Sequence, residues 1–363
     1  MNEGASGLDN RAMDEAEGVD GGQGQKAALE ISAAGDTHIG PRAHNEDVVM
    51  LRPDLNLFIV ADGAGGQNAG NVASTIAVTT ITHFFEETFD TARNQPAFDD
   101  LGLSTSARRL ATAIQRANSA VIEVAKTSKH YRGMGTTVVA AFFEPPRNVL
   151  HIGHVGDSRC YRMRNGHFEL LTKDHTLVND VLSLKPDMPD AQLAKLPRNV
   201  ITRALGMSAT VRVGIRSWEL AAGDVFMLAS DGLTDVVAGD EMLGALNRGE
   251  SPEAQAQGLL DLAEGRSKDN VAALVIGCKG ERKERSMWSL NAPSLSPPSG
   301  GSGGDSDYPE IMVVGQNEES QPELLVVPQV NLDSDIFHVV QDLTKPESSP
   351  VPPPPPVPDI KTE

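Results

Sequence analysis

Hydrophobic positions recur with two different periods along the central part of the chain. Helical spacing from Leu110 to Val124, and again from Ala69 to Phe85, predicts two helices that each bury one face. Apolar runs rich in β-branched residues predict strands at Val48–Leu51, Leu57–Ala61, Thr137–Phe143, Val149–Val155, Val225–Ala229 and Val271–Ile276. Short turns such as Arg164-Asn165-Gly166 join neighbouring strands, and the helices come in blocks. The pattern therefore predicts an α+β fold with antiparallel sheets rather than a wound parallel sheet.

Composition divides the chain into three parts. Residues 1–27 are rich in Gly, Asp and Glu, which predicts a disordered acidic tail, and residues 28–280 have the density of one globular domain. Residues 281–363 begin with a Gly/Ser-rich linker and end in a proline run, which predicts a flexible acidic tail. This tail contains three short apolar pieces, Ile311–Val314, Leu324–Val327 and Ile336–Val340. Either these pieces dock partners or the whole tail is a solvated tether, and its composition favours the tether.

The charge of the chain lies mostly in these flanks. Residues 1–27 have six acids and two bases, and residues 281–363 have fourteen acids and five bases, so the flanks account for −13 of the net charge of −19. An acidic chain is not expected to bind nucleic acid. The acidic N-terminus lacks the layout of a signal peptide, and no apolar run is long enough to span a membrane. Cys160 and Cys278 are too few for a disulfide framework or a cysteine metal site. We therefore expect a cytoplasmic protein.

A glycine-rich stretch, FIVADGAGGQNAG at residues 58–70, follows one predicted strand. A dinucleotide-binding fingerprint would need glycine where Asn68 stands, and a phosphate-binding P-loop would need Lys and Ser or Thr where Asn71 and Val72 stand. Neither motif explains Asp62, which lies at the end of the strand.

Asp62 belongs to a series of acids that abut apolar runs. The others are Glu46 and Asp47, Asp157, Asp231 and Asp269. Any one of them alone is best interpreted as a turn or helix-capping residue. Five such places favour a carboxylate cluster, and carboxylates without cysteine or suitably spaced histidine prefer Mg²⁺ or Mn²⁺.

The order of these acids resembles that of the bacterial metal-dependent protein phosphatases of the protein phosphatase 2C type. The resemblance covers residues 30–280 and rests on eight motifs in order: Arg42-Ala43-His44-Asn45-Glu46-Asp47, Val60-Ala61-Asp62-Gly63, Gly133-Met134-Gly135-Thr136-Thr137, Val155-Gly156-Asp157-Ser158-Arg159, Asp174-His175, Asn199-Val200-Ile201-Thr202-Arg203-Ala204-Leu205-Gly206, Ser230-Asp231-Gly232-Leu233 and Asp269-Asn270. It implies a sandwich of two antiparallel sheets with helices on both outer faces.

The resemblance also implies a role for each acid. Asp62 would bridge two Mn²⁺ or Mg²⁺ ions, Asp231 and Asp269 would hold one of them, and the Gly63 carbonyl would ligate the other. Glu46 and Asp47 would act largely through metal-bound waters. Asp157, with Asp231, would form a weaker third site, and Arg42 would hold the substrate phosphate.

The implied reaction is hydrolysis of phosphoserine and phosphothreonine in proteins. A water or hydroxide bridging the two cations would attack phosphorus, with Arg42, Asp62 and Asp231 as the catalytic residues. The implied partners are phosphorylated proteins and a cognate Ser/Thr kinase whose signal the enzyme reverses, and the catalytic domain is expected to be monomeric. No phospho-enzyme forms in this scheme, so Cys160 is interpreted as a core residue.

Three positions leave questions open. Ala64 stands where animal members carry the histidine thought to be their general acid, so the proton donor is unassigned. His175 is interpreted as structural, and His151 and His154 are predicted to face opposite sides of one strand. Leu177 to Pro197 matches the variable flap of bacterial relatives, although an ordinary surface loop fits equally well.

Two other functions remain open at this point. One is a non-catalytic module that keeps the fold and binds phosphoproteins. The other is a small-molecule phosphatase with the same chemistry.

Overall fold

The computed structural model describes residues 29–280 except 67, 68, 100, 101, 103, 198 and 199. The two predicted tails, as well as Asn68 and Asn199, lie outside the described residues. None of the described helices is long and apolar enough to cross a membrane.

The described strands form two antiparallel sheets. The five-stranded sheet has the order β1-β11-β10-β7-β8, and the other has the order β2-β3-β5-β6-β9 with β4 paired to β3. Their bounds are β1 Glu30–His38, β2 Asp47–Arg52, β3 Leu57–Ala64, β4 Gly135–Thr136, β5 Val138–Glu144, β6 Val149–Val155, β7 Arg159–Arg164, β8 His167–Leu170, β9 Gly214–Glu219, β10 Val225–Ala229 and β11 Val271–Lys279. All six predicted strands are present, and the predicted turn Arg164-Asn165-Gly166 joins β7 to β8. The hydrophobic pattern did not single out β1, β4, β7, β8 or β9.

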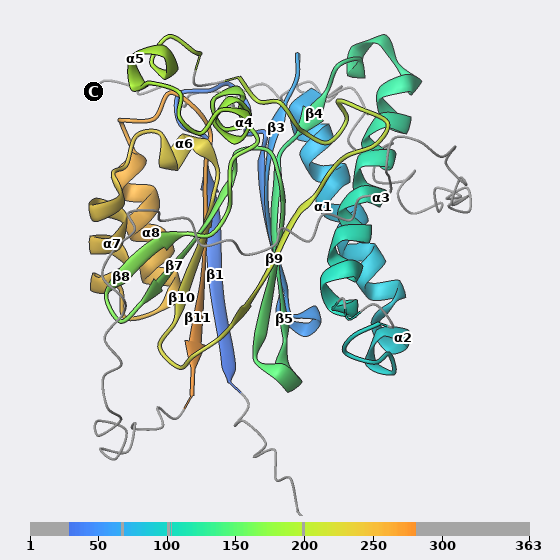
Figure 1. Cartoon of the computed structure of the whole chain (residues 1–363), viewed down its shortest axis with the longest axis vertical. Coiled ribbons are helices and arrows are strands. Elements are labelled where there is room, and N and C mark those ends of the chain that lie inside the picture. Colours follow the sequence, from blue (N-terminus) through green and yellow to red (C-terminus); the bar gives the residue numbers. More distant parts are fainter. Residues whose placement is uncertain (1–28, 67–68, 100–101, 103, 198–199, 281–363) are drawn as a thin grey trace, which may run out of the picture.

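Helices cover the outer faces of both sheets, with α1–α3 on one side and α6–α8 on the other (Figure 1). Their bounds are α1 Ala69–Glu87, α2 Phe89–Arg93, α3 Thr105–Thr127, α4 Leu177–Leu184, α5 Asp190–Leu193, α6 Asp231–Thr234, α7 Gly239–Arg248 and α8 Pro252–Ala263, with short 3₁₀ helices η1 Pro53–Leu55, η2 Lys129–Tyr131 and η3 Pro145–Arg147. Helices α1 and α3 are the two that the spacing predicts. The four-layer α+β sandwich is thus confirmed.

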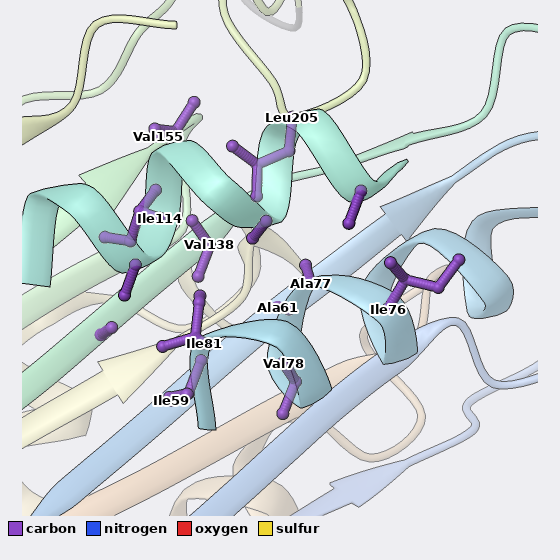
Figure 2. Close-up of a cluster of buried hydrophobic side chains, with 14 of the residues drawn as sticks. Ile59, Ala61, Ile76, Ala77, Val78, Ile81, Ile114, Val138, Val155 and Leu205 are labelled. Carbon is purple, nitrogen blue, oxygen red and sulfur yellow. The ribbon is translucent and has the colours of Figure 1, made fainter. Parts of the chain in front are cut away.

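Alternation along the strands separates the buried side chains into three layers. Figure 2 shows the layer between helices and sheet, where Ile76 and Ile81 of α1 and Ile114 of α3 pack on Ile59 and Val138. The neighbouring positions on the same strands point into the space between the two sheets, where they meet residues such as Phe226 and Leu274. A third layer lies under α7 and α8. A polar residue that has the same parity along a strand as the residues between the sheets must therefore also point into that space.

Candidate active site

The space between the sheets becomes polar at one end. On β3 the inward residues are Phe58 and Val60, and the next position with the same parity is Asp62. Asp47 is the direct partner of Asp62 in the β2–β3 register. The two aspartates therefore lie side by side on the inner face, where the apolar layer stops.

Other polar side chains continue the inward series on neighbouring strands and hold this end together. Ser230 follows β10 and donates a hydrogen bond to Oδ2 of Asp47 at 2.8 Å. Thr137 precedes β5, accepts a bond from the backbone N–H of Asp62 at 3.2 Å, and lies 2.7 Å from the Ser158 hydroxyl. No role was predicted for these three hydroxyls, although they have the same parity along the strands as the apolar residues that point between the sheets.

The acids that end different strands meet at this place. Asp231 begins α6 directly after β10, and Asp269 precedes β11. The Asp62 carboxyl lies within hydrogen-bonding reach of those of Asp47 and Asp231. No ion pair among the described residues involves any of these three. The structure brings together four of the acids predicted to cluster: Asp47, Asp62, Asp231 and Asp269.

Crowding changes the protonation of these carboxyls. Burial, followed by repulsion from Asp47 and Asp231, raises the pKa of Asp62 well above its usual range. Burial is also the main cause that raises the pKa of Asp47 to about 7 and that of Asp231 above its ordinary value. All three shifts favour the protonated carboxyl, and a cation bound to the cluster would favour the ionised form instead.

Asp157 lies at the edge of the cluster. Burial, then repulsion from Asp231, raises the pKa of Asp157 to about 7. Its Oδ1 atom is enclosed and has no hydrogen-bond partner among the described residues. An enclosed carboxylate oxygen without a donor is costly unless a cation or another donor reaches it.

After the glycine-rich stretch, the N-terminus of α1 lies against the side chain of Glu46. The Glu46 carboxylate accepts hydrogen bonds from the backbone N–H groups of Gly70 and Asn71 at the helix N-terminus. A Cβ on Gly70 would lie 2.6 Å from the carboxyl carbon of Glu46, and one on Gly63 would lie 2.1 Å from the carbonyl oxygen of Gly70. The glycines are thus needed for close approach. Because the helix already engages Glu46, its part in a metal site stays a prediction.

Arg42 lies at the mouth of the cluster and contacts one of its acids. Its Nη2 lies 2.6 Å from Oδ2 of Asp269, and its Nε donates to the carbonyl oxygen of Lys268 at 3.1 Å. Both side chains of the pair are largely exposed, at 50% for Arg42 and 42% for Asp269. Asn270 fixes the loop that carries Arg42, because its amide donates to the carbonyl oxygens of Ile39 and His44. The residues predicted to bind phosphate and metal therefore occupy one small area.

Three described histidines and Cys160 have surroundings that fit structural roles. His151 contacts Ser217 and Glu144, whereas His154 stacks on His175 at 4.7 Å between ring centroids, so the predicted opposite orientation is confirmed. His175 accepts a bond from the Gly156 N–H, and burial lowers its pKa to about 3, which fits the structural interpretation. Cys160 is fully buried, and burial raises the pKa of its thiol.

The predicted flap borders a cavity that reaches the acids. Helices α4 and α5 lie within Leu177 to Pro197, near the end of the sandwich where α6 begins (Figure 1). They contribute Val178, Asn179 and Leu193 to a cavity of about 710 Å³ that Asp157 and Asp231 also line. This position favours a substrate-facing element over an ordinary surface loop.

The donor set of the cluster fits hard divalent cations, although the side chains would have to rotate to hold them. All the side-chain donors are carboxylates, the ligands that Mg²⁺ and Mn²⁺ prefer, and the enclosed Oδ1 of Asp157 needs a partner. Among the described residues, no three or more Asp, Glu, His or Cys side chains are arranged as they stand to hold a metal ion. Since Asp62 contacts its neighbours directly, a bound ion would separate these carboxyls.

Comparison with known proteins agrees with this picture. Residues 34–262 match the sequence model of the family described as Protein phosphatase 2C. A putative protein phosphatase 2C-type protein of Streptococcus pyogenes serotype M6 is 31% identical over 253 residues, which are 68% of this chain and 98% of that protein. The serine/threonine protein phosphatase PstP of Mycobacterium tuberculosis is 34% identical over 235 residues, 64% of this chain but only 42% of PstP. A crystal structure of the catalytic domain of PstP in complex with two manganese ions superposes with a TM-score of 0.57 at 32% identity, covering 69% of this chain and all of that one.

Proposed function

The chain belongs to the protein phosphatase 2C family, and from this premise we propose that it is a protein-serine/threonine phosphatase that depends on Mn²⁺ or Mg²⁺. The observation that carries the proposal is the cluster of Asp47, Asp62 and Asp231, which lies between the sheets without a basic partner among the described residues. Bound cations would offset the mutual repulsion of carboxylates clustered in this way.

Each acid has a place in the proposed site. Asp62, central among the carboxyls, would bridge two ions; Asp231 and Asp269 would hold one of them, and the Gly63 carbonyl the other. Two divalent cations bound there would supply the Lewis acidity that brings the pKa of a water molecule close to neutrality and neutralises the phosphoryl oxygens. Asp47 is fixed by Ser230 and would orient water. Asp157 and Asp231 would hold a third, weaker ion, because the Oδ1 of Asp157 lacks a partner.

Arg42 is proposed to hold the substrate phosphate. Its guanidinium is exposed beside the cluster, and its fork of N–H donors matches phosphate oxygens. Since it also binds Asp269, phosphate and this carboxylate would compete for the same donors. A metal ion on Asp269 would weaken the ion pair and free Arg42 for substrate.

The protein side of the substrate is proposed to lie in the cavity under α4 and α5. This cavity is continuous with Asp157 and Asp231 and is large enough for several side chains. A peptide bound there would place its phosphorylated side chain near the cluster. Opposing a Ser/Thr kinase in bacterial signalling is the corresponding biological role.

The test is release of phosphate from a phosphothreonine peptide by the full chain with Mn²⁺, with Mg²⁺ and with EDTA. We expect turnover that rises with Mn²⁺ and disappears in EDTA. A sugar phosphate serves as the second substrate, and faster turnover of it would favour a small-molecule phosphatase. Binding of the phosphopeptide without any turnover would favour the non-catalytic module.

A further inference from the structure

A second cavity lies at the opposite end of α1 from the candidate site. It has a volume of about 610 Å³ and is enclosed by η1, α2, the start of α3 and η3. Because α1 begins at the acid cluster and its 19 residues rise about 1.5 Å each, the two sites are separated by roughly 28 Å. The chemistry proposed for the family site does not use this cavity.

Arg109 lines this second cavity and has no carboxylate partner among the described residues. Its guanidinium lies over the ring of Phe85 at 4.2 Å and near that of Phe142 at 5.6 Å. It donates from Nε to the Thr88 hydroxyl and from Nη2 to the Phe85 carbonyl oxygen. A guanidinium has five N–H groups, and two of them make these bonds, so Arg109 has donors left for a ligand of the cavity that it lines. Although burial lowers the Arg109 pKa to about 10, the group is charged at neutral pH.

The acids beside this cavity do not neutralise Arg109, because each has another partner. Asp54 binds Arg52 through both carboxylate oxygens. Glu144 binds His151 at 2.9 Å and Arg147 at 3.4 Å. Arg109 is therefore a half-buried cation that still needs an anion.

The rim of the cavity adds further cations and aromatic surface. Arg93 lies over the Phe89 ring at 5.0 Å, and Arg147 lies over the ring of Phe98 at 4.3 Å. Phe98 is 49% exposed. A complementary ligand would have carboxylates that pair with the arginines and, next to them, an aromatic or branched apolar side chain that packs on the phenylalanine rings.

The chain itself leaves the domain beside this cavity. Strand β11 ends at Lys279, which pairs with Glu30 of β1. The preceding residue, Leu29, donates its backbone N–H to the Asn148 side chain at 3.1 Å, and Asn148 directly follows η3. Helix η3 supplies Pro145, Pro146 and Arg147 to the cavity. The described chain therefore ends, at Gly280, close to the wall of the cavity.

We propose that this cavity binds Asp333–Leu343 of the chain's own C-terminal tail. The segment reads DSDIFHVVQDL, and of the three apolar pieces in the tail it alone has an aromatic side chain within the apolar run. Phe337 would enter the cavity between Phe89 and Phe142, and Asp335 would meet Arg109. The tail has fourteen acids and five bases, so its charge is complementary to the arginines. This inference modifies the expectation that the whole tail is only a solvated tether.

The tether is long enough for this contact. About 53 residues separate Lys279 from Asp333. A flexible chain of that length has a root-mean-square span of roughly 40 Å, so the segment can reach the cavity easily. Tethering also gives it an effective concentration near the millimolar range, which allows a weak contact to form.

The experiment uses the full chain with photoreactive benzoylphenylalanine in place of Phe337. We expect intramolecular cross-links that mass spectrometry maps to residues 89–97 or 142–147, with a yield that is independent of protein concentration and falls with added salt. Charge reversal by Arg93→Glu with Arg147→Glu should reduce the yield at least fivefold. Arg248→Glu with Lys126→Glu makes an equal charge change at the exposed C-terminal ends of α7 and α3, outside the cavity, and this matched control should leave the yield unchanged.

A variant with substitutions only in the tail controls for the possibility that the arginine variants misfold. Asp333→Asn, Asp335→Asn and Asp342→Asn together change no residue of the folded domain and should reduce the same cross-links as strongly. Cross-links that map elsewhere, that persist in both variants, or that form only between two copies would each overturn the proposal. Phosphate release from a small substrate is measured in parallel and should be the same in all variants, so a failure of the tail contact is distinguishable from a failure of the proposed enzyme.

Discussion

Two aspartates at opposite ends of strand β10 have contrasting surroundings; Asp224 is buried and Asp231 is half-buried. Asp224 directly precedes the strand, is 1% exposed, and binds Nε of Arg164 at 2.6 Å and Nη2 at 2.5 Å. It also accepts the backbone N–H of Ala221 at 2.8 Å. Asp231 lies just beyond the other end of the strand, where burial, and then repulsion from Asp235 and Asp269, raises its pKa, and no ion pair among the described residues involves it.

The difference separates a structural acid from one that we propose to be functional. At the Asp224 end the chain provides its own counter-charge, so folding alone satisfies the carboxylate. At the Asp231 end several carboxyls lie close together without a basic partner among the described residues. The counter-charge there would come from the bound cations that we propose. Perturbed carboxyls beside a cavity are typical of functional sites, whereas a bidentate pair with arginine is typical of structural ones. Substitutions at the two ends should therefore affect different properties.

The largest effect is expected at the crowded end. Asp62→Asn or Asp231→Asn should lower turnover of a phosphothreonine peptide by about 1,000-fold or more, because the carboxylates proposed to hold the metal pair are lost. The free energy of unfolding in EDTA should stay level or rise, since repulsion between carboxyls is relieved. Steady-state kinetics with Mn²⁺ and urea unfolding in EDTA check both. If Asp62→Asn still bound two Mn²⁺ ions tightly and turned over, the assignment of Asp62 would be wrong.

Asp224→Asn should show the reverse pattern. It weakens two charge-assisted hydrogen bonds to Arg164, so we expect the free energy of unfolding to fall by about 2–3 kcal/mol. Turnover, measured well below the unfolding temperature, should change less than twofold. A large loss of turnover in a folded Asp224→Asn protein would contradict the assignment of a purely structural role to Asp224.

The stacked histidines should make the site end sensitive to acid. His175 has an ordinary pKa of 6.5 and a folded-state pKa of about 3, so its contribution to stability is fully present above pH 6.5 and is lost as the pH falls toward 3. Between pH 7 and pH 5 this contribution should drop by about 1–2 kcal/mol. Urea unfolding of the metal-free chain and of His175→Gln across this range isolates the effect as their difference. Parallel curves for the two proteins would contradict it.

Asp157→Asn should have a smaller effect than the substitutions of the central acids. We expect turnover to fall about tenfold and the Mn²⁺ requirement to rise, because the proposed third ion is weak. Calorimetric titration with Mn²⁺ should show the first two ions still binding. Arg42→Ala is the matched comparison, for which we expect a higher KM at nearly unchanged metal affinity.

Thiol alkylation should have no effect. Cys160 is enclosed, and burial raises the pKa of Cys278 to about 12, so neither thiol is reactive in the folded chain. Native protein treated with iodoacetamide should retain full turnover, and mass spectrometry should find both cysteines modified only after denaturation. Inactivation with the fold intact would point to a different nucleophile.

The sequence was sufficient to predict the strands and helices whose hydrophobic residues recur with a clear period. The six apolar runs and the two amphipathic helices were recognisable because their burial is strong and periodic. Strand β1 was not, since EISAAGDTH has few large apolar residues and owes its place to pairing with β11. Helices α7 and α8, rich in small and polar residues, were missed for a similar reason.

The candidate site was predictable only in part. The acids stood out because each abuts an apolar run, and the motif order implied the roles that we propose for them. The hydroxyls of Ser230 and Thr137 were overlooked because single polar residues after a strand carry no signal without the register. The contact of Arg42 with Asp269 and the lone Arg109 depend on how distant segments pack, which no local pattern reports.

The pairing of β1 with β11 has a consequence for synthesis of the protein. The first strand of the domain is held on one side by the last, with Glu30 opposite Lys279 and His38 opposite Val271. At ribosomal rates of about 5–20 residues per second, β1 is made roughly 12–50 s before its partner. Asp269 joins the chain at the same late moment, immediately before β11. A nascent chain therefore cannot complete the acid cluster, and the proposed activity would begin only when the whole domain has left the ribosome.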